Sequence, residues 1–489
     1  MATYYTDYKN GNDTTGTGAT GAPWKTLTKF LAACANGDTC LVRGNGTDAT
    51  TFYAESGLST AKTSLTIQAD SGHEPIFVIA PVLTAWDKSG GYTNVYEKTS
   101  SQSYGVWNGE TPLNKASSLA NCDVVTNSWW YEGGKTYVNI GGGDPDDSGG
   151  LRSNTTAARV LDITGAGLTW DGVGIQWSMT SLWIKADNCT VKNATFKCMN
   201  LFDGAGYGLS VYAYTGFRLE NCIISNFHDV LAGYTGAQGV YLGTGSTNAT
   251  ITNCSISYCC NGVLVAAGAG AGHVVEDCTI SELYRNGVDI AAGVVTVRRN
   301  SFRDCGGGAL RMGSGATATV NHNSYRVTKT NPGPTGNNWG FILETGGIGT
   351  FYHNVAANLL LSSTGRAGFL IQQDASVGVF KNNISYNNAT GFAVSNAPTL
   401  ENDYNCAYGN TLNTSFPAGA HDVIADPLFV DSANGDFHLQ PGSPCIDTGV
   451  AIAGINDGYN GAAPDIGRYE TDAAGAPRQM MHYAKMRQQ

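Results

Sequence analysis

The chain has 489 residues, with 28 Lys and Arg against 39 Asp and Glu, which gives a formal net charge of −11 at pH 7. An acidic balance of this size argues against nucleic acid and anionic membrane surfaces as partners. Charged residues make up only 14% of the chain and glycine contributes 64 residues, so the composition departs from that of an average globular protein. No apolar run approaches the roughly 18 residues that would predict insertion into a membrane.

The first 50 residues are typical of a strand, a helix and a second strand. Leu27, Phe30 and Leu31 recur near helical spacing, and Asn36 with Gly37 closes the segment. An amphipathic helix at the open end of a stack of strands covers apolar surface and blocks edge-to-edge association. We therefore predict an N-terminal cap over residues 1–50.

Residues 81–157 carry four of the nine tryptophans and several tyrosines, with glycine turns between short strand-like segments. This composition predicts a small antiparallel β insertion. Trp129 and Trp130 could present a surface on which sugar rings stack, so we include them as candidate substrate-binding residues. The alternative, which we favour, is that a small insertion needs its aromatic side chains for its own core.

The sequence offers few residues that are candidate metal ligands. Asp144, Asp146 and Asp147 form the densest group of carboxylates. A calcium site needs several oxygen ligands that converge on one point, whereas three acids in one short segment are typical of a solvated turn. We expect no cofactor; calcium stays an open alternative, for which the sequence offers no convincing site.

Two short phrases alternate along the middle of the chain. One is written "ENCIIS" from Glu220, "TNCSIS" from Thr252 and "EDCTIS" from Glu276. The other begins with glycine and is written "GVYLG", "GVLVA", "GVDIA", "GALRM", "GFILE", "GFLIQ" and "GFAVS". Apolar residues recur at every second position, which predicts strands rather than helices.

The repeat predicts a solenoid of parallel strands over residues 51–415. Spacings between the glycines that open the second phrase run from 21 residues, Gly287 to Gly308, to 32 residues, Gly308 to Gly340. A coil of this size cannot bury its own apolar face, so neighbouring coils stack and share one core. Equivalent residues then lie about 4.8 Å apart on successive coils.

The cysteines of the first phrase, Cys222, Cys254 and Cys278, are predicted to stack at a corner as small buried fillers, beside asparagines that bond between coils. The alternative is a metal or catalytic role for these thiols, but no histidine recurs at an equivalent position of the repeats. The chain has 13 cysteines and begins "MATYYTDYKNG", without a signal-like segment, so we expect mostly reduced thiols. Cys34 and Cys40, which bracket one turn, are the candidate exception.

Candidate catalytic residues come from the outward positions of the glycine phrase. Asp289, Arg311 and Glu344 should be neighbours on successive coils, with the two carboxylates roughly 9 to 10 Å apart. Such a separation is near that of an inverting glycosidase, and Arg311 could bind a sugar carboxylate. A guanidinium is a poor base for a lyase. The alternative interpretation, which we favour, is a surface ion-pair ladder.

Further candidates lie near this face. Tyr241 occupies an equivalent outward position, and Arg285 and Asp304 lie in adjoining loops, so we assign these three as candidate substrate-binding residues. Leu264, Ile342 and Leu370 also occupy outward positions, and exposed apolar residues on a regular sheet predict a partner surface.

Motifs at both ends resemble a known superfamily. The opening "YYTDYKNGND…PWKTLTKFLAACANGDTCLVRG", the insertion, and the ending "ADPLFVDSANGDFHLQPGSPCIDTGV" followed by "PDIGRYE" are similar to segments of right-handed parallel β-helix proteins, which include pectate-lyase-like enzymes and bacteriophage tailspikes. The resemblance implies an all-β right-handed parallel β-helix solenoid with a capping helix, a β insertion and a closing coil at residues 416–475. It does not select an activity.

The resemblance also implies partners and a location. We expect a virion-associated, tailspike-like protein at the virion surface or outside the cell that recognises a host-surface polysaccharide, with depolymerisation of that polysaccharide as an open alternative. Alternatives are a secreted polysaccharide lyase or glycoside hydrolase, and a structural virion protein without glycan activity. Residues 476–489 form a basic, methionine-rich tail. We expect it to dock on another chain, either in a homotrimer of side-by-side copies or on other virion subunits.

Overall fold

The structure is a computed structural model of the whole chain. It describes residues 1–44, 53–78, 82–100, 105–108, 111–148, 150–154, 159–176, 178, 180–197, 206–227, 237–329, 339–344, 346–359, 367–372, 376–396 and 398–471. The predicted tail at 476–489 lies outside these residues. The chain divides into an N-terminal unit, Met1–Ala249 with Cys254–Cys260, and a C-terminal unit, Thr250–Asn253 with Asn261–Gln489.

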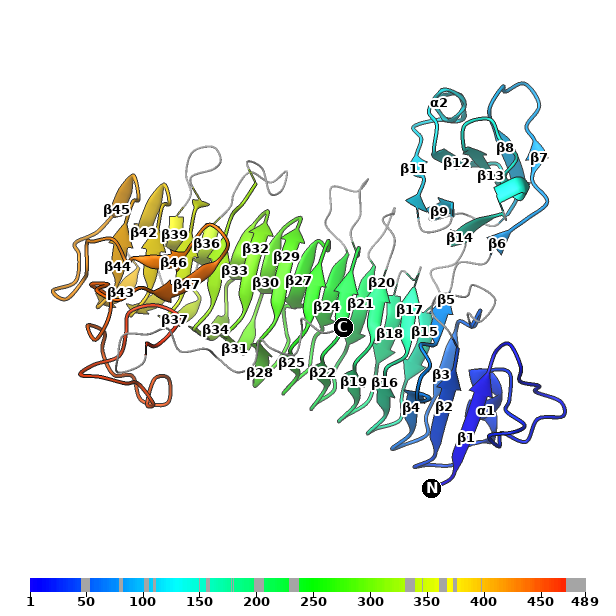
Figure 1. The fold of residues 1–489 in the computed structure, drawn as a ribbon, viewed down its shortest axis with the longest axis horizontal. Helices are drawn as coiled ribbons and strands as arrows, with labels where there is room; N and C mark the ends of the chain where they lie inside the picture. Colours follow the sequence, from blue (N-terminus) through cyan, green and yellow to red (C-terminus); the bar gives the residue numbers. More distant parts are fainter. Residues whose placement is uncertain are drawn as a thin grey trace. The chain divides into compact units, whose positions relative to one another are not determined.

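Each unit repeats one coil made of three short strands, and successive coils pair in parallel through three sheets (Figure 1). Side chains alternate between the shared core and the outside, as in Thr250-Ile251-Thr252, where only Ile251 is fully buried. This alternation is the period of two that the sequence predicts. The predicted all-β parallel solenoid is therefore confirmed.

The N-terminal unit begins with the cap helix α1 (Leu27–Ala33), which buries Leu27 and Phe30. Its first sheet contains β1 (Thr3–Asp7), β2 (Thr39–Arg43), β4 (Thr66–Ala69), β16 (Thr169–Asp171), β19 (Thr190–Lys192) and β22 (Arg218–Glu220). Its second sheet contains β3 (Leu58–Thr60), β15 (Arg159–Ile163), β18 (Thr180–Ile184), β21 (Tyr207–Val211) and β24 (Gln238–Leu242). Its third sheet contains β5 (Ile76–Val78), β17 (Gly174–Gln176), β20 (Thr195–Lys197), β23 (Ile223–Ser225) and β26 (Ser255–Ser257).

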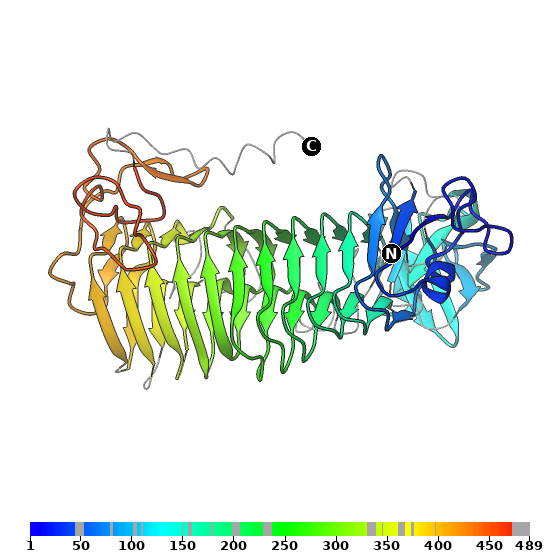
Figure 2. The same ribbon diagram turned by 90° about the horizontal axis from the view of Figure 1, so that it is seen from below.

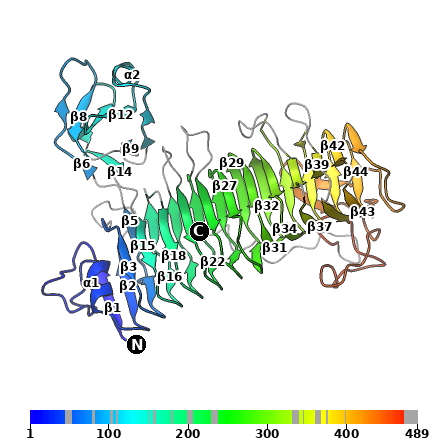
Figure 3. The same cartoon turned by 180° about the vertical axis from the view of Figure 1, so that it is seen from behind.

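The β insertion interrupts the N-terminal unit with small sheets of mostly antiparallel strands (Figure 3). Trp86, Trp129 and Val138 form part of its core. Its elements are β6 (Val82–Leu83), β7 (Asp87–Lys88), β8 (Tyr96–Thr99), β9 (Gly105–Asn108), β10 (Thr111–Pro112), β11 (Asn114–Lys115), α2 (Leu119–Val124), β12 (Ser128–Glu132), β13 (Lys135–Asn139), the 3-10 turn Pro145–Ser148 and β14 (Leu151–Asn154).

The C-terminal unit has longer, more regular strands, which run in one direction within each sheet (Figure 2). Its first sheet contains β25 (Thr250–Thr252), β28 (His273–Glu276), β31 (Gly293–Arg298), β34 (Ala316–Asn321), β37 (Ile348–Tyr352), β40 (Val377–Lys381) and β43 (Thr399–Asp403). Its second sheet contains β27 (Asn261–Val265), β30 (Asn286–Ile290), β33 (Gly308–Met312), β36 (Trp339–Leu343), β39 (Ala367–Gln372), β42 (Thr390–Ser395) and β45 (Leu412–Thr414). Its third sheet contains β29 (Thr279–Leu283), β32 (Ser301–Cys305), β35 (Ser324–Arg326), β38 (Val355–Ala357), β41 (Ile384–Tyr386) and β44 (Cys406–Tyr408).

After β45 the chain forms the closing segment, which contains the hairpin β46 (Phe429–Asp431) and β47 (Asp436–Leu439). Phe429, Phe437 and Ile466 of this segment pack against Val355 and Ile384 of the third sheet. The predicted division into cap, solenoid, closing coil and tail at the stated boundaries stays a prediction. None of the described helices is long and apolar enough to cross a membrane.

The corner between first and third sheets explains the repeated "NC" phrase. Asn221 takes a left-handed backbone, φ 54°, which asparagine tolerates better than most residues. Its Nδ2 donates to Asn193 Oδ1 of the neighbouring coil at 3.2 Å. The next residue, Cys222, points inward, and burial raises the pKa of its thiol well above the usual value, as expected for an inert filler. Cys34 and Cys40 are both buried free thiols.

In the C-terminal unit, Cys278 occupies this inward corner position on one coil, and asparagines occupy it on the coils that follow. Oδ1 of Asn300 accepts from the backbone N–H of Cys278 at 3.0 Å, and Oδ1 of Asn323 accepts from that of Asn300 at 2.9 Å. Asn354 and Asn383 continue the series. The result is a buried asparagine ladder that joins successive coils.

Candidate functional site

The three predicted catalytic residues meet on the outer side of the second sheet of the C-terminal unit. β30 pairs with β33 so that Asp289 lies opposite Arg311, and β33 pairs with β36 so that Arg311 lies opposite Ile342. Glu344 follows directly after β36. Strand alternation places all of these residues on the same face.

Arg311 joins the two carboxylates. Its Nη1 lies 2.9 Å from Asp289 Oδ1, and its Nη2 and Nε lie 2.6 and 3.0 Å from the two oxygens of Glu344. Burial lowers the pKa of Arg311, but the hydrogen bonds and charges of Glu344 and Asp289 offset this, so the pKa is raised overall. A guanidinium held in this way cannot act as a base, which argues against Arg311 as the base of a lyase.

A cavity of about 510 Å³ opens beside Arg311. Asp289 is nearly buried, and its Oδ2 also accepts from Asn286 Nδ2 at 3.1 Å. Glu344 keeps about a third of its side chain exposed. The cavity is also lined by the half-buried Trp339, the aliphatic Ile342, and by Arg285 and Gln372. Its lining therefore combines two acids, two arginines, amides and an aromatic ring.

Arg285 is the one predicted substrate-binding residue that lines this cavity. Tyr241 belongs to the N-terminal unit, where it packs on Tyr207 and Tyr212 with ring centroids 4.9 and 5.1 Å apart. Asp304 is fully buried, and its carboxylate accepts from the backbone N–H and hydroxyl of Thr328. We correct the assignment of Asp304, because a carboxylate without exposure cannot contact a dissolved ligand.

The insertion tryptophans separate into two environments. Trp129 is only 1% exposed and lies in the core of the insertion, so it offers no face to a sugar. Trp130 is half-buried, and its indole N–H donates to Glu132 at 3.1 Å. The core interpretation therefore holds for Trp129 and corrects its assignment to substrate binding.

The predicted apolar partner surface is also corrected. Ile342 is 4% and Leu370 is 7% exposed, and the two pack with Ala367 in a small cluster beside Trp339. Leu264 is half-buried. The outward direction of a side chain follows from strand alternation, but its exposure depends on neighbouring segments that the pattern of one strand does not reveal.

The described residues contain no group of three His, Cys, Asp or Glu that could hold a metal ion. Asp146, from the predicted solvated turn, accepts hydrogen bonds from the backbone N–H groups of Ala85 and Trp86 at 2.8 Å. This carboxylate therefore stabilises a turn inside the insertion.

Sequence reasoning missed Asn286 and Trp339 as lining residues. Asn286 precedes the glycine of its phrase, as Asn261 does one repeat earlier, and its N–H donates to Asn261 Oδ1 at 3.0 Å. The position of both residues directly before the repeated glycine was the available signal. The alternation that predicts outward positions was applied only to the residues after the glycine, so it did not include these two.

Comparison with known proteins agrees with the fold described above. Residues 173–347, less than half of the chain, match the family model described as a right handed beta helix region. The chain folds as a right-handed parallel β-helix. No curated protein sequence matches this β-helix protein significantly.

Several solved structures resemble the β-helix protein at low sequence identity. A structure titled "Glycoside hydrolase" is 9% identical with a TM-score of 0.57 over 83% of this chain and 96% of that one. The complex of XylC with xylose is 12% identical with a TM-score of 0.51 over 88% and 87%. Pectate lyase Pel9A is 14% identical with a TM-score of 0.45 over 96% of both chains. At these identities the likeness shows the fold alone.

Proposed function

We propose that this β-helix protein recognises a polysaccharide at the cavity around Arg311. The observation that carries the proposal is the lining itself. Trp339 offers an aromatic ring against which a sugar can pack, while Gln372, Asn286 and Glu344 supply groups that can hydrogen-bond hydroxyls. Carbohydrate sites in proteins need both kinds of group, because a pyranose has apolar faces and a polar rim.

The charges of the cavity favour an uncharged sugar chain. Asp289 and Glu344 balance Arg285 and Arg311, and Arg311 is already engaged by both carboxylates. To bind Arg311, an acidic sugar would have to displace Glu344 or Asp289 from this pair, which would leave a carboxylate without its partner. The XylC complex holds xylose on a similar fold, which agrees with a neutral glycan.

Hydrolysis is the second candidate activity. It is favoured by one observation, that two carboxylates flank a single guanidinium at the edge of the cavity. Paired carboxylates are the groups that glycosidases use as acid and base or nucleophile. In this proposal one of the two carboxyl groups protonates the leaving sugar oxygen and the other takes the proton of the attacking water. Glu344 is the more exposed of the two.

The biological setting proposed from the sequence resemblance is the virion surface, where a tailspike-like protein meets host glycans. The homotrimer and the docking of 476–489 on other subunits belong to this part of the proposal. A secreted glycan-acting enzyme, or a structural virion protein without glycan activity, would use the same fold differently.

The test is a panel of neutral and acidic polysaccharides incubated with the protein, read for binding, for new reducing ends and for absorbance of unsaturated uronates. We expect saturable binding of a neutral polysaccharide, weakened at least about tenfold by Glu344→Gln, because one charge-assisted hydrogen-bond acceptor is lost. Hydrolysis predicts reducing ends that Glu344→Gln abolishes.

The matched control is Glu401→Gln. Glu401 is also an ion-paired glutamate of the C-terminal unit, partnered by Lys381, but it does not line the cavity. Binding should be unchanged in this variant. If no polysaccharide binds, or if both variants lose binding equally, recognition at the Arg311 cavity is wrong.

A further inference from the structure

A second cavity, of about 540 Å³, lies between the first sheet of the C-terminal unit and the closing segment. Its lining includes Arg298, Arg299 and His322 from the sheet side and Arg468, Tyr469 and Glu470 from the closing segment. The last three belong to the "GRYE" part of the closing motif, which the Arg311 cavity does not use. A cavity of this volume suits a ligand of monosaccharide size.

Arg468 is the unusual member of this lining. It is only 4% exposed, and the described residues provide no carboxylate within ion-pair distance of it. Its Nη1 donates to Ser324 Oγ and its Nη2 to the carbonyl of Arg299 at 3.1 Å. Its Nε is buried and finds no acceptor among the described residues. A buried guanidinium without a counter-ion is costly, and native structures rarely leave one.

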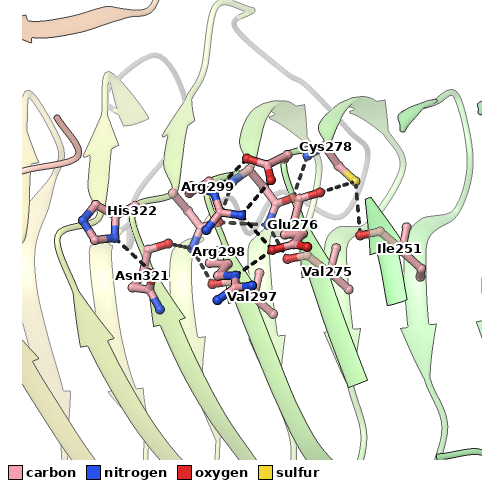
Figure 4. Close-up of polar contacts among 12 residues, drawn as sticks. Ile251, Val275, Glu276, Cys278, Val297, Arg298, Arg299, Asn321 and His322 are labelled. Carbon is pink, nitrogen blue, oxygen red and sulfur yellow. Dashed lines mark hydrogen bonds and ion pairs between the residues drawn. The ribbon is translucent and has the colours of Figure 1, made fainter. Parts of the chain in front are cut away.

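The neighbouring acids are already engaged. Glu276 pairs with Nε of Arg298 at 2.7 Å and with Arg299 at 2.7 Å, and Asp277 pairs with Arg299 at 2.7 Å. Figure 4 shows Arg298 and Arg299 directed toward Glu276, with Asn321 and His322 beyond them. Glu470 accepts from the backbone N–H groups of Asn460 and Asp465 at 3.0 and 3.1 Å.

Among the described residues, two paired carboxylates serve the three arginines of this lining, which leaves Arg468 without an ion-pair partner. Arg298, Arg299 and Arg468 contribute three positive charges, and Glu276 and Asp277 contribute two negative ones. Burial, with a smaller contribution from Asp465, raises the pKa of Glu470 to about 7. Burial, reinforced by His353, Arg468 and Arg299, lowers the pKa of His322 well below its usual value, so that its ring adds no charge.

We propose that this cavity binds a carboxylate ligand of about monosaccharide size, held by Arg468 and Arg298. A carboxylate supplies the counter-ion that the buried guanidinium of Arg468 lacks among the described residues, and it is an anion that guanidinium groups bind in a preferred planar geometry. The site is separate from the Arg311 cavity and does not depend on its proposed function.

The experiment is calorimetric titration of the full chain with D-glucuronate, with D-glucose as the uncharged counterpart of the same ring and inorganic sulfate as a divalent anion. We expect glucuronate to bind saturably with one site at this cavity, and glucose not to bind there. Arg298→Gln should weaken glucuronate binding at least tenfold. Arg468→Lys, which keeps the charge and loses the planar guanidinium, should also weaken it.

The matched control is Arg218→Gln. Arg218 also extends from a first-sheet strand and also bonds a glutamate through Nε at 2.7 Å, but it belongs to the N-terminal unit. Glucuronate affinity should be unchanged in this variant. The proposal is overturned if glucuronate does not bind, if sulfate binds and glucuronate does not, or if Arg298→Gln binds glucuronate as tightly as the unaltered chain.

Discussion

Arg311 lies between two carboxylates, whereas no carboxylate of the described residues lies within ion-pair distance of Arg468, although both guanidinium groups belong to the C-terminal unit. The charge of Arg311 is neutralised by the protein, and the charge of Arg468 is buried without an ion-pair partner among those residues. The surroundings of each arginine, rather than its residue type, are therefore the basis on which we propose different ligands for the two cavities.

The register of Asp289 and Arg311 could be predicted from sequence, because the repeated glycine aligns the strands and alternation decides the face. The burial of Asp304 could not be predicted from its position in the sequence next to that face. It lies on β32, whose alternation turns Phe302 and Asp304 inward and Arg303 outward. Its backbone is also left-handed, φ 51°. Acidic side chains are so rarely buried that the residue type alone predicts an exposed position, whereas Asp304 is buried.

Asp304 gives a prediction at this scale. Asp304→Ala should lower the free energy of unfolding by about 2–4 kcal/mol, because Thr328 loses its buried acceptor and alanine is strained at positive φ. Asp304→Asn should lose less, since asparagine tolerates the left-handed backbone and keeps one acceptor. Arg303→Gln, at the neighbouring half-buried position, should cost less than either, because its ion pairs with Glu282 at 3.2 Å and Asp304 at 3.8 Å involve a side chain that is 43% exposed. Urea unfolding of the three variants provides the measurement, and equal stability of all three would contradict the buried role.

At the scale of elements, the corner between the first and third sheets carries much of the information in the repeats. The sequence predicts a cysteine stack from "NC" phrases, and Cys222 and Cys278 do occupy inward corner positions. It also predicts asparagines that bond between coils, but beside the cysteines and not at the inward position that asparagine takes from Asn300 onward. In "KNNIS" either of two consecutive asparagines could face inward, and a change of one residue reverses the choice. The left-handed φ of 58° at Asn382 decides it, because it turns Asn383 toward the core.

The ladder predicts strong sensitivity at Asn323. Its Oδ1 accepts from N and Nδ2 of Asn300 at 2.9 and 3.0 Å, and its Nδ2 donates to the carbonyl of Val297 at 2.8 Å. Asn323→Ala should therefore lower the free energy of unfolding by about 2–5 kcal/mol, because several buried groups lose their partners. Asn323→Cys, which imitates the corner at Cys278, should lose less because a thiol fills part of the volume.

Asn434→Ala is the control for the ladder. Asn434 is exposed and bonds only within its own turn, to Asp431, so its replacement should cost less than about 1 kcal/mol. Urea unfolding midpoints, together with hydrogen exchange of the strands around β34, measure both changes. A loss at Asn323 no larger than the loss at Asn434 would show that the ladder does not stabilise the coils.

At the scale of the whole C-terminal unit, the closing segment is fastened to the coils through polar contacts as well as an apolar cluster. His353 Nδ1 donates to the carbonyl of Gly467 at 3.0 Å, and its Nε2 accepts from the amides of Asn382 and Asn456 at 3.0 and 2.8 Å. The fold class could be predicted from repeats because each coil obeys local rules. The attachment of the closing segment through His353 could not be predicted, because it joins residues more than a hundred positions apart.

The same contacts make the stability of the unit depend on pH. Burial lowers the pKa of His353 to about 4, although its bond to Gly467 opposes the change. A histidine whose folded pKa lies below its unfolded value contributes stability above about pH 6.5, and that stability is lost as the pH falls toward 4. The shift corresponds to about 3 kcal/mol. Glu470 acts in the opposite direction, because its raised pKa favours the folded state at low pH and that contribution is lost as the pH rises through about 7.

His353→Asn separates the two contributions, since Glu470 is present in both proteins and cancels in the comparison. Asparagine suits the left-handed backbone at this position, φ 55°, and the next coil has Asn382 at the equivalent corner. We expect the variant to lose less stability than the unaltered chain between pH 7 and pH 4.5, with the two curves converging by up to about 3 kcal/mol. Urea unfolding at a series of pH values measures this, with His73→Asn in the N-terminal unit as the control. Parallel curves for His353→Asn and the unaltered chain would mean that protonation of His353 does not release the closing segment.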